Sequence, residues 1–348
     1  MNSKLAMFYE NKNVLITGGA SFIGSHLVEQ LLECGASVRV IDDLSSGNLS
    51  HLNRILPDFE FINYDLRDKN NLSNFFNKQD VVFHLAAIHG GRGFIENFQI
   101  EMLDNFTIDT NVFSSAKAQG VKNIVHASSA CAYPISLQDD SDNRNLLQED
   151  QANFNEIGKA FPDGVYGWTK LMGEYQLKTF ADKNTQGRSA RIFTAYGERE
   201  NLSHAAIALI AKSDLKLDPF PVWGDGNQTR NFTHVSDTVQ GLLFLGADQR
   251  NLNFDVFNIG TSTHIRVIDF IKEIHTQLNW QPNKWNFELD KPTGVASRAS
   301  DNSKIYNVFG WQPSLGMDEG IKRTIDWYLG WSERPNSFQE LNDKLLAR

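Results

Sequence analysis

Cysteine is scarce in this sequence, which has only two, Cys34 and Cys131, in 348 residues. A reducing compartment is the simplest setting for so few thiols, and we expect no disulfide between them. No apolar run approaches the roughly 20 residues that cross a bilayer. Residues 1–13 are polar and mixed, and they lack the apolar core of a signal peptide. We therefore expect a cytoplasmic protein with no membrane partner.

Positive charge is also in deficit, because 33 lysines and arginines face 42 aspartates and glutamates, for a formal net charge of -9. A general nucleic-acid binder needs a basic face to neutralise phosphates, so we expect no nucleic-acid partner. An anionic small molecule is still compatible, since a few local arginines outweigh the distant average. The hydrophobic fraction of 41% and the charged fraction of 22% are ordinary for a globular enzyme.

Short β-branched runs alternate with helical patterns in the first half of the chain. The expected strands are 14–17, 37–41, 60–62, 80–84 and 123–126, and the expected helices are 25–33, 71–77 and 99–119. Strand and helix in alternation predict an α/β fold of the Rossmann type, with a doubly wound parallel sheet.

The later half is less regular. A helix is expected at 166–180 and a sixth strand at 189–193, followed by helices at 205–212, 236–246, 267–278 and 318–327. Two stretches, 218–226 and 282–300, are expected to be rich in loops. This pattern predicts a smaller α/β lobe that is partly interleaved with the sheet domain.

The segment TGGASFIG, from Thr17 to Gly24, follows the first expected strand and opens a helix, which is the setting of a dinucleotide-binding turn. Gly18 permits the tight turn, and Gly24 lets the helix pack closely on the strand. The backbone amides at the helix start can hold a pyrophosphate. The predicted contacts in this turn are Gly18, Ala20, Ser21, Phe22, Ile23 and Gly24. An ordinary tight turn is the alternative interpretation.

Asp42 ends the second expected strand, 18 residues after Gly24. A carboxylate there can bond the ribose hydroxyls of adenosine and repels a 2′-phosphate, so it favours NAD over NADP. The alternative is that Asp42 and Asp43 merely start a turn.

The predicted NAD-binding domain covers 1–193, with 234–262 returning to it, and the predicted substrate lobe covers 194–233 and 263–340. We expect no metal site.

Ser129 follows the fifth expected strand, and Tyr166 and Lys170 lie one turn apart on the next long helix. With Asp65-Leu66, His84-Leu-Ala-Ala87 and Asn105, their order resembles the extended short-chain dehydrogenase/reductase family, specifically its nucleotide-sugar epimerases and dehydratases, from about residue 13 to 327. The resemblance implies that Tyr166 takes a hydroxyl proton while hydride leaves the same carbon, that Lys170 stabilises the tyrosinate, and that Ser129 bonds the reacting oxygen. It also implies NAD contacts by Asp65, Leu66, Leu85, Ala86, Ala87, Asn105 and Lys170. The family usually carries glycine where this chain has Ser21.

Cys131 lies two residues after Ser129, so along an extended segment it should point to the same side, toward the substrate. The surrounding SSACAYP resembles GDP-mannose 3,5-epimerases and GDP-fucose synthases. The segments 90–95, 223–233 and 294–298 are similar to the first group, whereas His204 resembles the second. The resemblance implies that Cys131 and His204 move protons at carbons 3 and 5, because a ketone at carbon 4 acidifies the hydrogens there. The alternatives are a small buried residue for Cys131 and a helix cap or phosphate ligand for His204.

Several residues of the second half are expected to hold the substrate. Arg230 and Arg298 fall where the family grips the pyrophosphate, and a planar guanidinium suits bidentate phosphate contact. The predicted substrate contacts are Gly91, Arg92, Gly93, Thr194, Lys212, Trp223, Arg230 and Arg298. The helices at 99–119 and 166–180 resemble those that pair in the family's dimers, so the resemblance implies a homodimer.

The favoured hypothesis is an NAD-dependent epimerase of a GDP-mannose-like nucleotide sugar. It would oxidise carbon 4 transiently, exchange protons at carbons 3 and/or 5, and reduce carbon 4 again. One alternative is a nucleotide-sugar 4-epimerase in which Cys131 and His204 only shape the pocket. Another is a 4-keto-sugar epimerase/reductase, against which Asp42 counts because such enzymes usually take NADPH. A scaffold protein without the chemistry is disfavoured by the intact serine, tyrosine and lysine.

Overall fold

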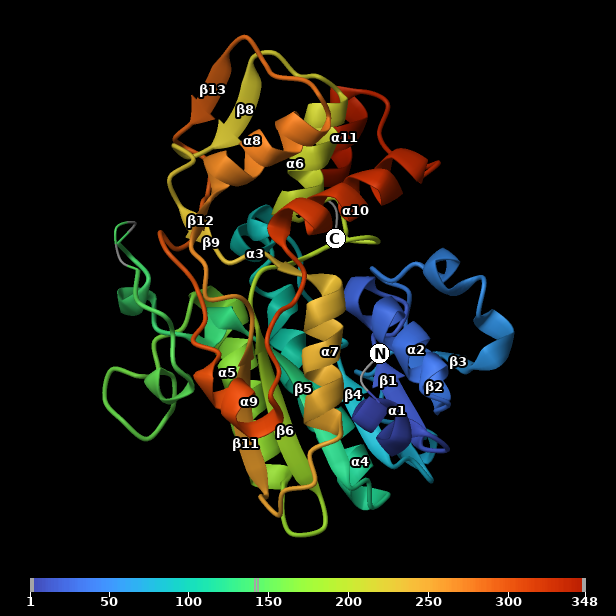
Figure 1. Ribbon diagram of the computed structural model, residues 1–348. Coiled ribbons are helices and arrows are strands. Elements are labelled where there is room, and N and C mark those ends of the chain that lie inside the picture. Colours follow the sequence, from blue (N-terminus) through green and yellow to red (C-terminus); the bar gives the residue numbers. More distant parts are fainter. Residues whose placement is uncertain (1–2, 141, 143, 346–348) are drawn as a thin grey trace.

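The computed structural model, which describes residues 3–140, 142 and 144–345, has a larger and a smaller lobe (Figure 1). The larger lobe contains a seven-stranded parallel sheet in the order β11-β6-β5-β4-β1-β2-β3. Its strands are β1 (Asn13–Thr17), β2 (Ser37–Asp42), β3 (Glu60–Asn63), β4 (Val81–His84), β5 (Asn123–Ser129), β6 (Gln186–Ile192) and β11 (Phe254–Ile259). The predicted doubly wound parallel sheet is confirmed.

Helices cover both faces of this sheet. They include α1 (Ser3–Tyr9), α2 (Phe22–Glu33), α4 (Asp104–Ala118), α5 (Gly164–Phe180), α7 (Val235–Gly246) and α9 (Ser303–Phe309). Successive residues of a strand point to opposite faces. Val14 and Ile16 of β1 therefore belong to the core under α2 and α7, whereas Leu15 between them belongs to the core under α4.

The carboxyl ends of the central strands lie on the side of the smaller lobe (Figure 1). Thr17 ends β1, His84 ends β4 and Ser129 ends β5. In open α/β sheets, ligands bind in the crevice outside this edge. The sheet therefore brings the predicted cofactor and catalytic segments, which are far apart in the sequence, to one edge.

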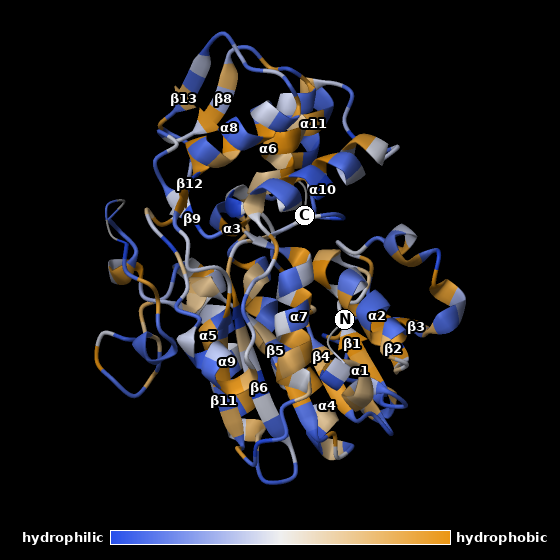
Figure 2. Ribbon diagram, in the orientation of Figure 1, coloured by the Kyte–Doolittle hydropathy of each residue, from blue (hydrophilic) through white to orange (hydrophobic). Residues whose placement is uncertain are grey.

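The smaller lobe has its own apolar core. Its elements include α6 (Ala205–Asp214), α8 (Val267–Gln277), α10 (Met317–Gly330), α11 (Phe338–Leu345), β8 (Phe220–Trp223) and β13 (Trp285–Glu288). Ile210, Phe220, Phe270 and Ile274 are fully buried together. Figure 2 shows hydrophobic residues where these helices meet and hydrophilic residues on their outer sides. The two-residue strands β7 (Ala195–Tyr196), β9 (Thr229–Arg230), β10 (Thr233–His234) and β12 (Ile265–Arg266) form small pairs along the connections.

The prediction of loops at 218–226 and 282–300 is wrong for part of each stretch. β8 and β13 pair in parallel, with Phe220 opposite Trp285. Such short strands carry little local signal, and what stabilises them is a partner distant in the sequence. Phe220 is fully buried against Trp285 and His275, so packing decides the conformation here.

Other differences concern helices. The helix expected at 71–77 is a 3-10 helix at Leu72–Phe76, and the one expected at 99–119 is a 3-10 helix at Glu101–Leu103 followed by α4. Helices α1, α3 (Arg92–Asn97), α9 and α11 were not predicted. In the part of the chain that the structure describes, no helix is both long and apolar enough to span a bilayer.

The chain crosses between the lobes more than once. Residues 234–262 contain α7 and β11, and β11 lies at the sheet edge beside β6. Helix α9 packs on β11, and Ile305 belongs to the main core of the sheet. Part of the segment 263–340, which the sequence assigns to the substrate lobe, therefore lies against the sheet.

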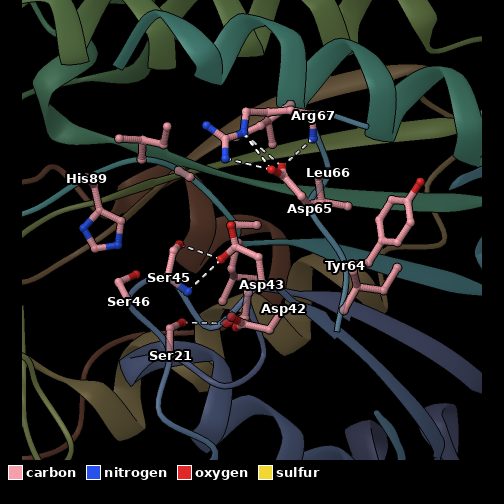
Figure 3. Close-up of a pocket in the computed structure, with 17 residues that line it drawn as sticks. Ser21, Asp42, Asp43, Ser45, Ser46, Tyr64, Asp65, Leu66, Arg67 and His89 are labelled. Carbon is pink, nitrogen blue, oxygen red and sulfur yellow. Dashed lines mark hydrogen bonds and ion pairs between the residues drawn. The ribbon is translucent and has the colours of Figure 1, made fainter. Parts of the chain in front are cut away.

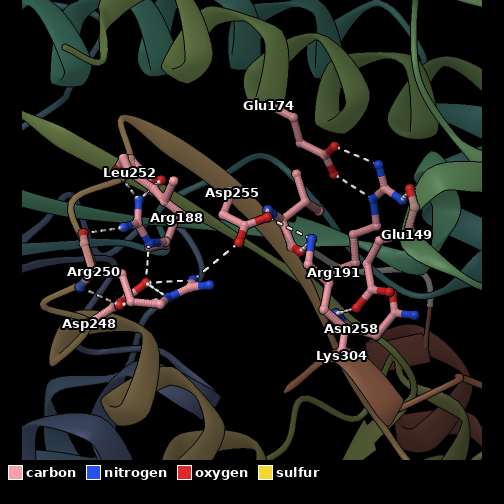
Figure 4. Close-up of polar contacts among 12 residues, drawn as sticks. Glu149, Glu174, Arg188, Arg191, Asp248, Arg250, Leu252, Asp255, Asn258 and Lys304 are labelled. Carbon is pink, nitrogen blue, oxygen red and sulfur yellow. Dashed lines mark hydrogen bonds and ion pairs between the residues drawn. The ribbon is translucent and has the colours of Figure 1, made fainter. Parts of the chain in front are cut away.

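Buried ion pairs tie β6 to neighbouring helices and loops (Figure 4). Arg188 Nε donates to Asp248 Oδ2 at 2.5 Å, just beyond α7. Arg191 donates to both oxygens of Glu174 on α5, at 2.9 and 2.8 Å, and Ser128 of β5 donates to the same carboxylate at 2.5 Å. These pairs fix the position of α5 on the sheet, and α5 carries the predicted tyrosine and lysine.

Candidate active site

The turn between β1 and α2 has the close contacts that its glycines predict. Gly18 has a φ of 73°, and a Cβ there would lie 2.7 Å from Ala86 N. A Cβ on Gly24 would lie 2.1 Å from Gly18 O, so only glycine lets α2 begin this near to β1. The Ser21 hydroxyl turns back and donates to Gly18 O at 2.5 Å. A serine fits here because its polar group is satisfied within the turn.

A groove opens beside this turn, at the ends of β1, β2 and β4 (Figure 3). It holds about 570 Å³ of empty space, its open mouth included. The predicted cofactor contacts in its lining are Gly18, Ser21, Asp42, Asp65, Leu66, Leu85, Ala86 and Ala87. The other predicted contacts, Ala20, Phe22, Ile23, Gly24, Asn105 and Lys170, lie around the groove and not in its lining. Tyr64, Arg67, Ile88 and His89 also line it and were not predicted.

Three carboxylates, those of Asp42, Asp43 and Asp65, stand in the wall of the groove (Figure 3). Asp42 at the end of β2 accepts hydrogen bonds from Ala20 N at 3.0 Å and Leu44 N at 2.9 Å. Asp65 after β3 pairs with Arg67 at 2.7 Å. The backbone amides hold Asp42 beside the glycine turn, at the place where a ribose carboxylate is needed.

Asn105, predicted as a cofactor contact, lies beneath the groove and holds its floor. Its side chain accepts from Ile88 N at 2.7 Å and donates to Ile88 O at 3.0 Å. This pair of bonds fixes the backbone between Ala87 and His89. The residue therefore supports the groove through the segment after β4.

The predicted hydride-transfer residues meet at the end of β5. The Ser129 side chain lies near enough to the Tyr166 hydroxyl to lower its pKa, and Lys170 Nζ lies 5.8 Å from the centre of the Tyr166 ring. Lys170 Nζ donates to Ala127 O at 2.8 Å. Burial raises the pKa of Tyr166 and lowers the pKa of Lys170. Formation of a tyrosinate here therefore depends on nearby positive charge.

Cys131 reaches the site by a different route from the one predicted. The segment after Ser129 is a 3-10 helix, Ala130–Ala132, and Ser129 Oγ accepts the Cys131 N–H at 3.1 Å. The extended segment assumed for strand alternation is therefore wrong. Cys131 nevertheless lies beside a predicted substrate contact, because Arg298 Nη1 donates to its Sγ at 3.4 Å. A guanidinium stabilises negative charge on an adjacent sulfur.

Asp163, immediately before α5, organises two arginines around Cys131. Its carboxylate accepts from Arg92 Nη1 at 3.1 Å and from Arg298 Nη2 at 3.1 Å, and its N–H donates to Cys131 O at 2.9 Å. Burial opposes ionisation, but Arg298 and Arg92 bring the pKa of Asp163 below its usual value. Arg298 also donates to Gln138 Oε1 at 2.5 Å. The sequence analysis missed Asp163 and Gln138, because neither belongs to a motif.

His204 lies at the start of α6 beside two further polar residues. Its side chain makes no capping hydrogen bond, which does not favour the helix-cap interpretation. Nδ1 lies 3.5 Å from Oε1 of the buried Glu200, and burial raises the pKa of Glu200. The His89 ring, in the groove lining, is centred 5.7 Å from the His204 ring. The sequence analysis missed His89 and Glu200, although His89 directly precedes the glycines of the predicted substrate loop.

Gly91 joins the His89 loop to the His204 loop. A Cβ on Gly91 would lie 1.8 Å from Ser203 O and 3.6 Å from His204 N. Any side chain at this position must therefore displace the backbone that carries His204.

We expect Gly91→Ala to lower kcat by about 100-fold, because a displacement of about 1 Å in a catalytic group has effects of that size. Gly330→Ala, at the end of α10, is the matched control, since its Cβ would meet nothing within 4 Å. Steady-state kinetics and thermal unfolding of the two variants are the measurements. An equal kcat in Gly91→Ala and in the native protein would show that the close contact of Gly91 with Ser203 O is not required.

The remaining predicted substrate contacts lie on the side of the smaller lobe. Lys212 is buried with Nζ 5.7 Å from the centre of the Trp223 ring, and burial lowers its pKa to about 8. Arg230 donates to Thr229 O and Thr293 O, both at 2.7 Å. Thr194 accepts a backbone hydrogen bond from Thr233 at 2.8 Å and is held in the connection between the lobes.

Comparison with known proteins decides the family of this site. The pattern of the NAD dependent epimerase/dehydratase family matches residues 14–260. The chain belongs to this family. It is 31% identical to GDP-mannose 3,5-epimerase of Arabidopsis thaliana over 325 residues, 91% of this chain and 82% of that protein. It is 30% identical to UDP-N-acetyl-alpha-D-glucosaminuronate decarboxylase of Bacillus cytotoxicus over 326 residues, 91% and 98% of the two chains.

A solved member of the family has the same fold. The crystal structure of UDP-glucuronic acid 4-epimerase from Bacillus cereus, in complex with UDP-glucuronic acid and NAD, matches with a TM-score of 0.80 and 26% identity, covering 90% of this chain and 98% of that one. The present chain is accordingly an NAD-dependent nucleotide-sugar epimerase. Its residues fit NAD, because the Gly18–Gly24 turn leaves backbone room for a pyrophosphate and Asp42 is held where the ribose lies.

Proposed function

We propose that this enzyme is a 3,5-epimerase of GDP-mannose or of a closely related GDP-hexose. The observation that carries the proposal is the presence of two proton-transfer groups beside the hydride-transfer residues. Cys131 lies against Arg298 and two residues after Ser129, and His204 lies against Glu200. A 4-epimerase that transfers only hydride at carbon 4 needs neither group, because it moves no protons at carbons 3 and 5. The GDP-mannose 3,5-epimerase relative supports this choice, whereas the decarboxylase and 4-epimerase relatives support only the nucleotide-sugar class.

The cycle begins with oxidation at carbon 4. Tyr166 takes the proton of the carbon-4 hydroxyl, and Ser129 holds that oxygen by a hydrogen bond. NAD, when bound, accepts hydride from carbon 4 and later returns it. Lys170 stabilises the tyrosinate because its ammonium lies beside the ring in a buried site.

Proton exchange follows at the neighbouring carbons. The carbon-4 ketone withdraws electrons, so the hydrogens on carbons 3 and 5 become acidic. Cys131 and His204 remove a proton from one face and return a proton to the other, which inverts the carbon. Tyr166 then gives its proton back to the carbon-4 oxygen, so the sugar is restored with no net oxidation.

The nucleotide part of the substrate is assigned to the side of the smaller lobe. Arg230 and Arg298 supply guanidinium groups for the pyrophosphate. Lys212 and Trp223, whose side chains are in contact, supply a cation and an aromatic face for the rest of the nucleotide. Arg92, Gly91 and Gly93 form the loop beside the sugar.

The proposal includes a homodimer through α4 and α5. Trp168 and Tyr175, two turns apart on α5, are 39% and 47% exposed, and Leu103 at the start of α4 is 48% exposed. Apolar side chains on one face of neighbouring helices are typical of a contact surface. We also propose a cytoplasmic location, in keeping with only two cysteines in the sequence. Sedimentation velocity tests the assembly, and a stable monomer would remove this part of the proposal.

Incubation with NAD and GDP-mannose in D2O, followed by NMR of the sugar protons, tests the function. We expect an epimerised product that carries deuterium at carbon 3, carbon 5 or both. Conversion without deuterium would instead establish the 4-epimerase alternative. Turnover of UDP-sugars but not of GDP-mannose would overturn the choice of nucleobase.

A further inference from the structure

A buried polar cluster lies behind the hydride-transfer residues. Asp109 on α4 is 2% exposed, and its Oδ1 lies 3.0 Å from His84 Nε2. Its Oδ2 lies 3.8 Å from His126 Nε2 on β5. His84 Nδ1 lies 2.7 Å from Thr17 Oγ1. No step of the proposed reaction uses this cluster, yet a buried carboxylate is costly without a compensating positive charge.

The two histidines differ in what they offer this carboxylate. His84 Nε2 donates a hydrogen bond to Asp109 Oδ1 at 3.0 Å. Burial lowers the pKa of His126 to about 3, so His126 is neutral near pH 7.

Burial raises the pKa of Asp109 and the hydrogen bond from His84 lowers it, and a further group that lowers it is Lys170. It is 4% exposed, and Nζ donates to the carbonyl of Ala127, which follows His126 on β5. A Cβ on Gly173, one turn after Lys170, would lie 2.4 Å from Asp109 Oδ2. The carboxylate therefore packs against α5 close to the lysine. Burial lowers the pKa of Lys170, and the charge of Asp109 opposes this effect.

We propose that Asp109 is a positioning residue whose buried carboxylate keeps the Lys170 ammonium charged beside Tyr166. Tyr166 and Cys131, the other titratable groups around Lys170, are negative only when they have lost a proton. The Asp109 carboxylate, in contrast, supplies negative charge throughout the cycle. The inference rests on the proposed roles of Tyr166 and Lys170 in hydride transfer and not on which sugar is bound.

A double-mutant cycle, measured by thermal unfolding without substrate, tests the pairing of Asp109 with Lys170. Lys170→Met leaves Asp109 buried without its counter-charge, so we expect the melting temperature to fall by about 5 °C or more. Asp109→Asn keeps an acceptor for His84. Combined with Lys170→Met it removes both charges, so the double variant should melt above Lys170→Met alone. Additive losses would overturn the proposal. Because no turnover is needed, the outcome is independent of whether GDP-mannose is the substrate.

A pH profile tests the effect on catalysis with GDP-mannose or whichever nucleotide sugar is turned over. In Asp109→Asn, Lys170 loses its proton more easily. The pH at which kcat falls on the alkaline side of its profile should therefore be lower by about one pH unit or more, with KM little changed. We expect kcat near neutral pH to fall about 10- to 100-fold. An unchanged pH of the alkaline fall would overturn the proposal.

The matched control is Glu174→Gln, an equally buried carboxylate of α5 whose partners are Arg191 and Ser128. It should change the melting temperature and leave the pH of the alkaline fall unchanged. If Asp109→Asn does not fold, Asp109→Ser removes the same charge without adding bulk, and both measurements apply to it unchanged.

Discussion

Cys131→Ala is expected to lower the rate of epimerisation, and of the deuterium incorporation that accompanies it at carbons 3 and 5, by about 10²- to 10⁴-fold. The substitution removes the sulfur that lies against Arg298, and no neighbouring group replaces it as a base at that face. Transient reduction of bound NAD by the sugar should continue, because Tyr166 and Lys170 are unchanged. NMR in D2O measures the exchange, and the absorbance of NADH measures the hydride step.

Cys34→Ala is the matched control for this result. Cys34 lies at the end of α2, 4% exposed and part of the main core, so its loss should leave exchange intact. His204→Ala should lower epimerisation in the same way, because the proposed inversion needs a group on each face of the carbon. Loss of epimerisation in Cys131→Ala but not in His204→Ala would assign both proton transfers to the thiol. Normal exchange in Cys131→Ala would contradict the proposed mechanism.

Tyr166→Phe is expected to lower hydride transfer by about 10²- to 10⁴-fold, which is the usual contribution of a positioned acid or base. The change removes only the phenolic oxygen, from a ring whose centre lies 5.8 Å from Lys170 Nζ. Rapid-mixing measurement of NADH absorbance after addition of GDP-mannose follows the step. Deuterium exchange should fall in parallel, because the carbon-4 ketone no longer forms.

Tyr175→Phe on the same helix provides the comparison. Tyr175 is 47% exposed, so its hydroxyl lies outside the buried site and its removal should leave the hydride step unchanged. Affinity for NAD should be similar in both variants. Hydride transfer at the native rate in Tyr166→Phe would show that another group takes the hydroxyl proton.

The features that could be predicted from the sequence are those set by a few consecutive residues. Gly18 and Gly24 are needed because the backbone of α2 and β4 comes too close for any Cβ, and their spacing is visible in the chain. Tyr166 and Lys170 face the same way because they lie one helical turn apart. The alternation of strands and helices likewise predicted the parallel sheet, since buried strands are apolar throughout.

Predictions that extended a local rule beyond its range were less successful. Strand alternation was applied to Cys131, but Ser129 caps a 3-10 turn at that point and the chain leaves the strand. The pairing of β8 with β13 was missed, because each strand is short and its partner is remote. In both cases a hydrogen bond or a packing contact, and not the residue pattern, decides the backbone.

The sequence by itself determined the sheet, the dinucleotide turn and the tyrosine–lysine pair, because short-range geometry specifies each of them. Only the tertiary structure decided that Asp163 holds two arginines around Cys131, and that Asp109 lies behind Lys170. These carboxylates act through charge at a distance of a few ångströms. Such a distance arises when separate strands and helices pack together, and no spacing along the chain encodes it.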